Sequence, residues 1–360
     1  MIGRTLKSPA CRALGALMAP VLALTLSSCG SSDADPSSAN GPTKVRVASA
    51  GMIPSSLDLV WAIEGGFFKE HGLDVTMTPP LFATDLANAV LSNDAEFAVL
   101  NGTVVASARD AGRPLTVVAT NQAPMPLSIA FTDNADKKLR DQGLSESSSV
   151  GDLFEALKGM TLGTAPVGST VTAAYRYLLA EFGIVPEKDN ITLQAMPDLA
   201  SQVAALSNDR VDGLLSATGG ASTGAAAQGT GVIWDITKMK DTEALGAIPW
   251  QNIVTSETTV GKDPEMIQSF LEALHEAQLA LIEGLSPEDA ASLKQLLAAD
   301  MDDQVYDATF SQEVSLFPET FATSDSTWET ILEVAEVDSD GPLDAPAADA
   351  VNNSFAEKIE

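Results

Sequence analysis

From residue 44 onward, short apolar runs alternate with segments in which apolar residues recur every three or four positions. The runs predict strands over 44–49, 73–77, 97–100 and 115–120, and then over 160–164, 191–195 and 211–215. The intervening segments predict helices over 57–68, 86–91, 104–110, 171–182 and 200–206. Strands that alternate with helices are typical of an α/β protein with largely parallel sheets.

The second half of this pattern repeats the first. Residues 91–97 read Leu-Ser-Asn-Asp-Ala-Glu-Phe, and residues 206–212 read Leu-Ser-Asn-Asp-Arg-Val-Asp. Their separation of about 115 residues is the size of one small α/β unit. Two such units in tandem predict two lobes with a ligand cleft between them.

The predicted lobes are discontinuous in sequence. We expect lobe 1 to comprise 44–124 plus 251–360, and lobe 2 to comprise 125–250. Two hinge crossovers would join them, one near 121–126, where Pro124 and Pro126 favour an extended path, and one near 248–255. In the C-terminal part, the runs Asp-Pro-Glu from residue 263 and Ser-Pro-Glu from residue 286 predict helix starts.

The N-terminus has the features of an export signal. Residues 1–28 contain basic but no acidic residues, and an apolar run over 13–24 is too short to span a bilayer. The following Leu-Ser-Ser-Cys, ending at Cys29, resembles the bacterial lipobox, which implies lipidation of Cys29 and a membrane anchor outside the cytoplasm. An ordinary signal peptide with a chance cysteine is the alternative. Residues 29–43 contain no large apolar side chain and predict a flexible tether.

Composition excludes several other classes of function. The only other cysteine, Cys11, lies in the signal, so the mature chain has no disulfide or free thiol nucleophile. With 49 acidic against 20 basic residues, the net charge of −29 argues against nucleic acid as a partner. No phosphate loop, dinucleotide fingerprint or metal-ligand cluster occurs, so we expect no cofactor and no metal site, and we expect a monomer.

Several runs of the sequence together resemble one family of proteins. The run Val-Arg-Val-Ala at 45–48, followed by Trp-Ala-Ile-Glu-Gly-Gly-Phe-Phe-Lys-Glu-His-Gly-Leu-Asp-Val at 61–75, resembles the opening of NMT1/THI5-like and sulfonate/taurine/nitrate-type solute-binding proteins. The runs at 89–94, 111–115, 157–163 and 210–213 fit the same pattern, so the resemblance extends over about 44–335. It implies a type II periplasmic-binding-protein fold that closes over a ligand, and an ABC permease and ATPase as partners.

Ligands of open α/β sheets bind at the carboxyl ends of the strands. The loops at those ends contain no charged residue and supply these candidate ligand-binding residues: Ser55, Ser56, Thr84, Asn101, Gly102, Thr103, Gly168, Ser169, Thr170 and Thr218.

The residue types in these loops also indicate the class of ligand. Hydroxyl groups at helix N-termini favour an anion, so we expect the ligand to be a small organic anion such as a sulfonate or taurine. The same hydroxyls are also ordinary N-caps. A pyrimidine or other small heterocycle is the alternative ligand, with Trp61 and Trp250 either stacking on the ring or packing in the core.

An enzyme is a distant alternative. Gly-Ala-Ser-Thr-Gly at 220–224 matches a nucleophile-elbow pattern centred on Ser222, but a hydrolase also needs a histidine base. The only histidines are His71, which is predicted to lie at a helix end beside Gly72, and His275, which is predicted to lie inside an amphipathic helix over 267–281. We therefore expect no catalytic residue.

Overall fold

The computed structural model describes residues 41–81, 84–166, 168–217, 220–242, 248–337, 339 and 341–359. They belong to one compact unit, Gly41–Glu360. The predicted signal peptide, Cys29 and most of the tether lie outside the described residues. No helix within the described ranges is both long enough and apolar enough to cross a membrane.

The first sheet combines four strands from residues 43–122 with one strand from residues 251–256. Its strand order is β2 (Leu73–Met77), β1 (Thr43–Ala48), β3 (Phe97–Leu100), β10 (Gln251–Ser256) and β4 (Leu115–Gln122). Strand β1 runs parallel to β2 and β3, whereas β10 runs antiparallel to β3 and β4. The helices of this lobe are α1 (Leu57–Glu64), α2 (Phe67–Glu70), α3 (Thr84–Leu91), α4 (Gly102–Asp110), α11 (Glu257–Lys262), α12 (Pro264–Glu283), α13 (Pro287–Ala298), α14 (Asp303–Val314), α15 (Asp325–Glu336) and α16 (Ala347–Ala350).

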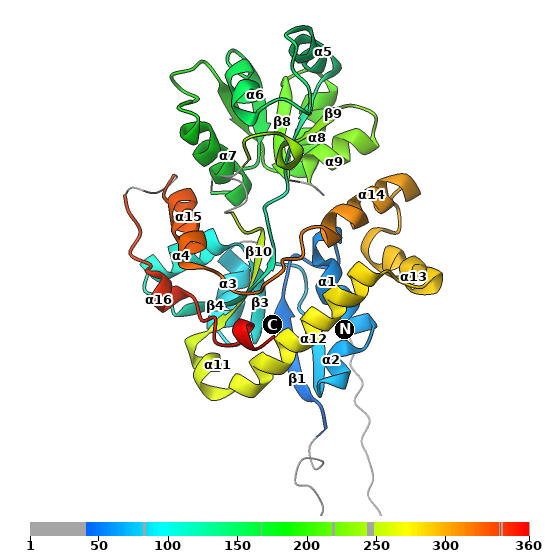
Figure 1. Cartoon of the computed structure of the whole chain (residues 1–360), viewed down its shortest axis with the longest axis vertical. Helices are drawn as coiled ribbons and strands as arrows, with labels where there is room; N and C mark the ends of the chain where they lie inside the picture. The colour runs from blue at the N-terminus through cyan, green and yellow to red at the C-terminus, as the bar shows by residue number, and fades with distance from the viewer. Residues whose placement is uncertain are drawn as a thin grey trace, which may run out of the picture. The chain divides into compact units, whose positions relative to one another are not determined.

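The second sheet repeats this topology. Its order is β7 (Thr192–Ala195), β6 (Thr161–Thr164), β8 (Gly213–Ala217), β5 (Leu127–Phe131) and β9 (Val232–Asp235), with β5 antiparallel to β8 and β9. Its helices are α5 (Asp133–Asp141), α6 (Val150–Ala156), α7 (Thr170–Glu181), α8 (Leu199–Ser207) and α9 (Ala221–Ala227). Figure 1 shows the two sheets, each flanked by its helices. The predicted fold class, two α/β lobes joined by two crossovers, is confirmed.

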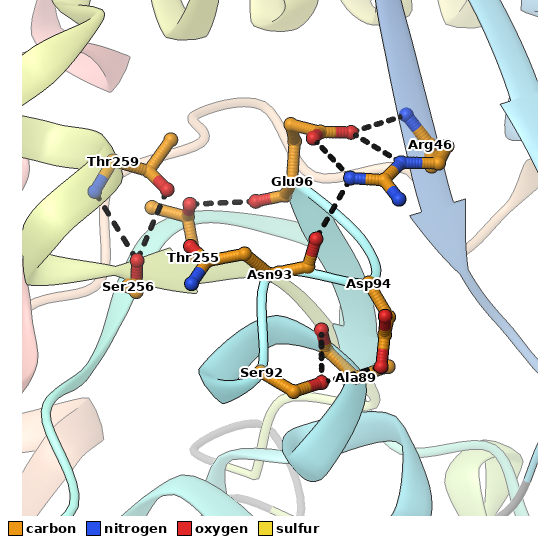
Figure 2. A network of polar contacts seen from close by, with 9 residues as sticks. All are labelled: Arg46, Ala89, Ser92, Asn93, Asp94, Glu96, Thr255, Ser256 and Thr259. Carbon is orange, nitrogen blue, oxygen red and sulfur yellow. Dashed lines mark hydrogen bonds and ion pairs between the residues drawn. The ribbon is translucent and has the colours of Figure 1, made fainter.

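One carboxylate precedes each of two corresponding strands, although the two differ by one position in the sequence repeat. Glu96, just before β3, accepts a hydrogen bond from the backbone N–H of Arg46 on β1 at 2.7 Å and forms an ion pair with its guanidinium (Figure 2). Asp212, just before β8, accepts from the backbone N–H of Thr161 on β6, also at 2.7 Å. Each carboxylate therefore provides a hydrogen-bond acceptor for a backbone N–H of the neighbouring parallel strand. These two acidic residues thus have a structural role.

Each lobe has its own apolar core. In lobe 1 the ring of Phe270 on α12 stacks on Phe68 and Phe97, with ring centroids 4.7 and 4.2 Å apart. In lobe 2 every position of β5 is buried, and Phe131 packs edge-on against Trp234. These cores fix the helix starts and strand ends on which the candidate loops lie.

The structure corrects two sequence predictions. The helix predicted over 57–68 is two helices, because Gly66 adopts a left-handed conformation with φ of 87° and α2 begins after it. The segment 248–255, predicted as a crossover, is mostly strand β10 at the interior of the first sheet. Only its start crosses between the lobes, where it pairs with the first crossover: Met125 N–H donates to Ile248 O at 2.8 Å, and Trp250 N–H donates to Gln122 O at 2.9 Å.

Candidate ligand-binding cleft

A cavity of about 490 Å³ lies where the carboxyl ends of β3 and β6 meet. Both lobes contribute to its wall, which consists of Leu86, Val99, Leu100, Asn101, Val104, Ala165, Pro166, Gly168, Ser169, Thr170 and Pro197. None of these residues is charged. The volume falls in the range of small-molecule sites, which combine mostly apolar walls with a few placed polar groups.

The N-terminus of α7 supplies polar groups from lobe 2. Ser169 occupies the N-cap position with extended backbone angles, but its hydroxyl makes no capping hydrogen bond. The first amides of a helix have no acceptor within the helix, and the N-terminus carries a partial positive charge. An uncapped N-terminus at a cavity wall is therefore suited to an anionic or strongly dipolar group.

The N-terminus of α4 faces it from lobe 1. Asn101 occupies the N-cap position without capping the helix, and its side-chain amide donates instead to the backbone carbonyl of Trp250 on the second crossover. Thr103 and Thr170 lie across the gap from each other, with their hydroxyl oxygens 2.9 Å apart. The two helix starts are thus in direct contact.

A second cavity of about 310 Å³ adjoins the first along α4 and shares Val104, Gly168 and Thr170 with it. Its wall includes Arg113, whose guanidinium donates to the side-chain oxygen of Asn88 at 3.1 Å. Arg113 is the one charged residue among the lining residues of both cavities. Any charged group bound in the larger cavity would therefore depend on backbone amides and hydroxyls.

Behind the loop that holds Ser55 and Ser56 lies a buried polar cluster. The side chain of Gln122 donates to the carbonyl of Ser55 at 3.4 Å and to Glu313 on α14 at 3.5 Å. Glu313 is fully buried, and this burial, followed by the repulsion from Asp58, raises its pKa to about 8.

Asp58 is buried in the same cluster. It accepts hydrogen bonds from the side-chain amides of Asn121 at 3.0 Å and Gln278 at 2.9 Å. Burial nevertheless raises its pKa above the ordinary value, against the effect of these bonds. No basic side chain pairs with either carboxylate among the salt bridges of the described residues.

The structure brings together six of the ten candidate residues. Those six, all at the starts of α4 and α7, are Asn101, Gly102, Thr103, Gly168, Ser169 and Thr170. Gly102 is buried, and a Cβ there would lie 2.7 Å from Ile331 Cδ1, which gives this glycine a packing role.

The other four candidates are placed elsewhere or lie outside the description. Ser55 and Ser56 form the 3₁₀ turn before α1 and do not line either cavity. Thr84 begins α3, but its side chain is not described, and Thr218 lies outside the described residues.

Sequence reasoning missed the apolar wall. Leu86, Val104 and Pro197 line the larger cavity and were not among the candidates. Pro197 follows strand β7, so the principle that ligands bind at the carboxyl ends of strands would have identified this residue as well. Leu86 and Val104 lie within helices, where an apolar residue that lines a cavity cannot be distinguished by its type from an apolar residue of the core.

The geometry gives the Ser222 hydrolase alternative no support. Ser222 is fully buried, and its hydroxyl lies 2.7 Å from that of Ser128. Both histidines belong to lobe 1: His71 pairs with Glu276 at 3.0 Å, and His275 packs against the ring of Phe321. Among the described residues, the hydroxyl partner of Ser222 is therefore Ser128, and neither histidine contacts it.

The two tryptophans considered for ring stacking, Trp61 and Trp250, are each partly buried against an apolar cluster. Trp61 packs against Phe67 and the apolar cluster beneath α13 and α14. Trp250 packs against the core of lobe 2 from the second crossover. The ring N–H groups of both are buried, and neither has a hydrogen-bond partner among the residues that the structure describes.

Two α/β lobes of equal topology, paired crossovers and a cavity shared by both lobes define a periplasmic-binding-protein fold. The model of the family described as NMT1/THI5 like matches residues 53–290, more than half of the chain. The chain belongs to the NMT1/THI5-like family. No curated protein sequence matches the chain.

Solved structures share the fold at low sequence identity. A periplasmic protein of Methylobacillus flagellatus KT assigned to sulfonate transport, SsuA, is 15% identical with a TM-score of 0.64, over 88% of this chain and 94% of that one. The alkanesulfonate-binding protein SsuA of Xanthomonas axonopodis pv. citri, bound to MOPS, is 16% identical with a TM-score of 0.60, over 88% and 100%. The nitrate-binding protein NrtA of Synechocystis PCC 6803 is 18% identical with a TM-score of 0.50, over 76% and 69%.

Proposed function

We propose that this protein is the extracytoplasmic solute-binding component of an ABC importer, and that it captures a small organic anion such as a sulfonate. Family membership supports the solute-binding role. The similar structures include sulfonate- and nitrate-binding proteins, one of which is described as part of a sulfonate ABC transporter. The observation that carries the choice of ligand is the uncapped N-terminus of α7 in a cavity wall without charged residues.

The proposed mechanism is hinge closure. Two crossovers join the lobes, and each lobe supplies one helix N-terminus to the cavity. A solute that contacts both helix starts binds the closed form more tightly than the open form, so it shifts the equilibrium toward closure. The closed form then delivers the solute to the permease, while lipidation at Cys29 and the tether over 29–43 keep the protein at the membrane.

A thermal-shift screen of the unit Gly41–Glu360 tests the function. The panel comprises alkyl and aryl sulfonates, taurine, sulfate, nitrate, amino acids and pyrimidines. A ligand at 100 times its Kd stabilises the native state by about 2.7 kcal/mol, which corresponds to a shift of a few degrees. We expect stabilisation by sulfonates. A response to pyrimidines alone would favour the heterocycle alternative, and no response to any compound would contradict solute capture from this panel.

The affinity for that anion should depend on Ser169. The Ser169→Ala variant removes a hydroxyl that caps no helix, so we expect a loss of affinity of about 10-fold with little change in stability. Isothermal titration calorimetry and chemical denaturation measure the two quantities.

Ser149 provides the matched control. It is the N-cap of α6, and its hydroxyl does accept a hydrogen bond, from Asp152 N–H at 3.1 Å. Ser149→Ala should therefore reduce stability by about 1 kcal/mol and leave affinity unchanged. If Ser169→Ala behaves in the same way as Ser149→Ala, Ser169 is an ordinary cap.

A further inference from the structure

Helix α15 has two buried faces that belong to different lobes. Trp328 and Ile331 pack in the lobe 1 cluster with residues of α4 and the first sheet. Val334 is fully buried, yet it packs in the lobe 2 cluster with residues of α7. Figure 1 shows α15 beside both α4 and α7.

The chain on both sides of α15 is fixed to lobe 1. Before the helix, the backbone N–H of Thr120 on β4 donates to Phe321 O, and the hydroxyls of Thr120 and Thr323 lie 2.7 Å apart. After it, Trp328 Nε1 donates to Ala345 O at 2.7 Å, and Asn352 N–H donates to Val117 O at 2.9 Å. The helix is therefore a rigid projection of lobe 1, because both of its flanks are held to the same sheet.

Its last turn makes a polar contact with lobe 2 as well. The hydroxyl of Tyr177 on α7 donates to the carboxylate of Glu333 at 3.1 Å. Burial, together with this carboxylate, raises the pKa of Tyr177 to about 12, so the phenol remains a donor at physiological pH. Separation of the lobes would break this bond and expose Val334 to water.

Helix α15 contacts both of the helices, α4 and α7, whose first turns line the proposed ligand cavity. Ile331 packs on Gly102, the first residue of α4. Tyr177 is two turns beyond Thr170, the first residue of α7, whose hydroxyl meets that of Thr103. One element thus touches both halves of the site and lines only its smaller, adjoining cavity, through Ala335.

We propose that α15 is an interlobe latch: Glu333 and Val334 hold α7 against lobe 1 and thereby set the distance between the starts of α4 and α7. Both are positioning residues that act on the open–closed equilibrium. When only a fraction of the molecules is closed, the apparent Kd equals the intrinsic Kd divided by that fraction, so a weaker latch lowers the affinity.

Distance measurement by electron spin resonance tests the latch without any ligand. The unit Gly41–Glu360 contains no cysteine, so Lys138→Cys on α5 and Lys262→Cys on α11 place one exposed spin label on each lobe. We expect Tyr177→Phe and Val334→Ala each to shift the distance distribution toward longer values, and their combination to shift it further. Glu329→Ala, on the exposed face of the same helix, is the matched control and should leave the distribution unchanged.

The distance measurement tests the latch alone, because it needs no ligand. Only the affinity measurement rests on the proposed function. A ligand found by the screen should restore the short distance in the variants and bind them about 3- to 10-fold more weakly. If Val334→Ala fails to fold, Tyr177→Phe combined with Glu333→Gln decides the question, since the first change removes only the donor hydroxyl, the second removes only the negative charge, and both nearly preserve the side-chain shape. Unchanged distances in folded variants would overturn the proposal, even if a ligand is found.

Discussion

The Glu313→Gln variant should be more stable than the natural protein above pH 8 and about equally stable near pH 4.5. Glu313 has an ordinary pKa of 4.5 when unfolded and about 8 in the folded protein. Because the folded state holds this proton more tightly, its contribution to stability is complete below pH 4.5 and is lost as the pH rises to about 8. A shift of this size corresponds to roughly 3–5 kcal/mol.

Chemical denaturation at several pH values measures this dependence. Glutamine is neutral at every pH and has nearly the same shape, so the difference in unfolding free energy between the two proteins isolates Glu313 from the other carboxylates. Glu319→Gln, an exposed change on the following loop, serves as the control and should not alter the pH dependence. A difference between Glu313→Gln and the natural protein that stays constant from pH 4.5 to 8.5 would contradict the buried, protonated state.

The Gly102→Ala variant should lose stability at a position where helix propensity predicts a gain. Gly102 is the first residue of α4, and an added Cβ would lie 2.7 Å from Ile331 Cδ1 in a buried contact. Overpacking of this kind costs about 1–3 kcal/mol, which exceeds the gain of about 1 kcal/mol from replacing glycine in a helix. Since the clash displaces the start of α4, the affinity of the cleft should fall as well.

A double-mutant cycle with Ile331→Val tests the cause. Removal of Cδ1 takes away the nearest atom, so the second change should recover part of the stability lost in Gly102→Ala. Gly261 in α11 is the matched control, because a Cβ there would meet nothing within 4 Å, and Gly261→Ala should be neutral or stabilising. Additive effects of Gly102→Ala and Ile331→Val would show that the two residues do not clash.

Periodicity predicted most elements that carry the cleft. The strands at 73–77 and 97–100 coincide with β2 and β3, because short apolar runs bounded by glycine or polar turns have few alternatives. Strands β5, β9 and β10 were not predicted as strands. Their pairing joins distant segments of the chain, and nothing local to residues 251–256 indicates a position between β3 and β4.

The candidate site was predicted at the level of loops. The rule of carboxyl strand ends identified the starts of α4 and α7, and Thr103 and Thr170 do meet. This rule could not identify Glu313 and Val334. A glutamate is an ordinary residue on the surface of a helix, and a valine is an ordinary residue on its buried face. Their importance comes from packing between segments far apart in the sequence: α14 against the loop of Ser55, and α15 against α7.

Val104 offers the most direct test of our proposal that the solute binds between the starts of α4 and α7. It lies in the first turn of α4 and lines both cavities, so the Val104→Trp variant places an indole where the ligand is proposed to sit. The measurement is isothermal titration of the best ligand from the screen into this variant, after denaturation shows that it is folded. We predict that binding is lost. Unchanged affinity in a folded Val104→Trp protein would place the ligand elsewhere and contradict the account.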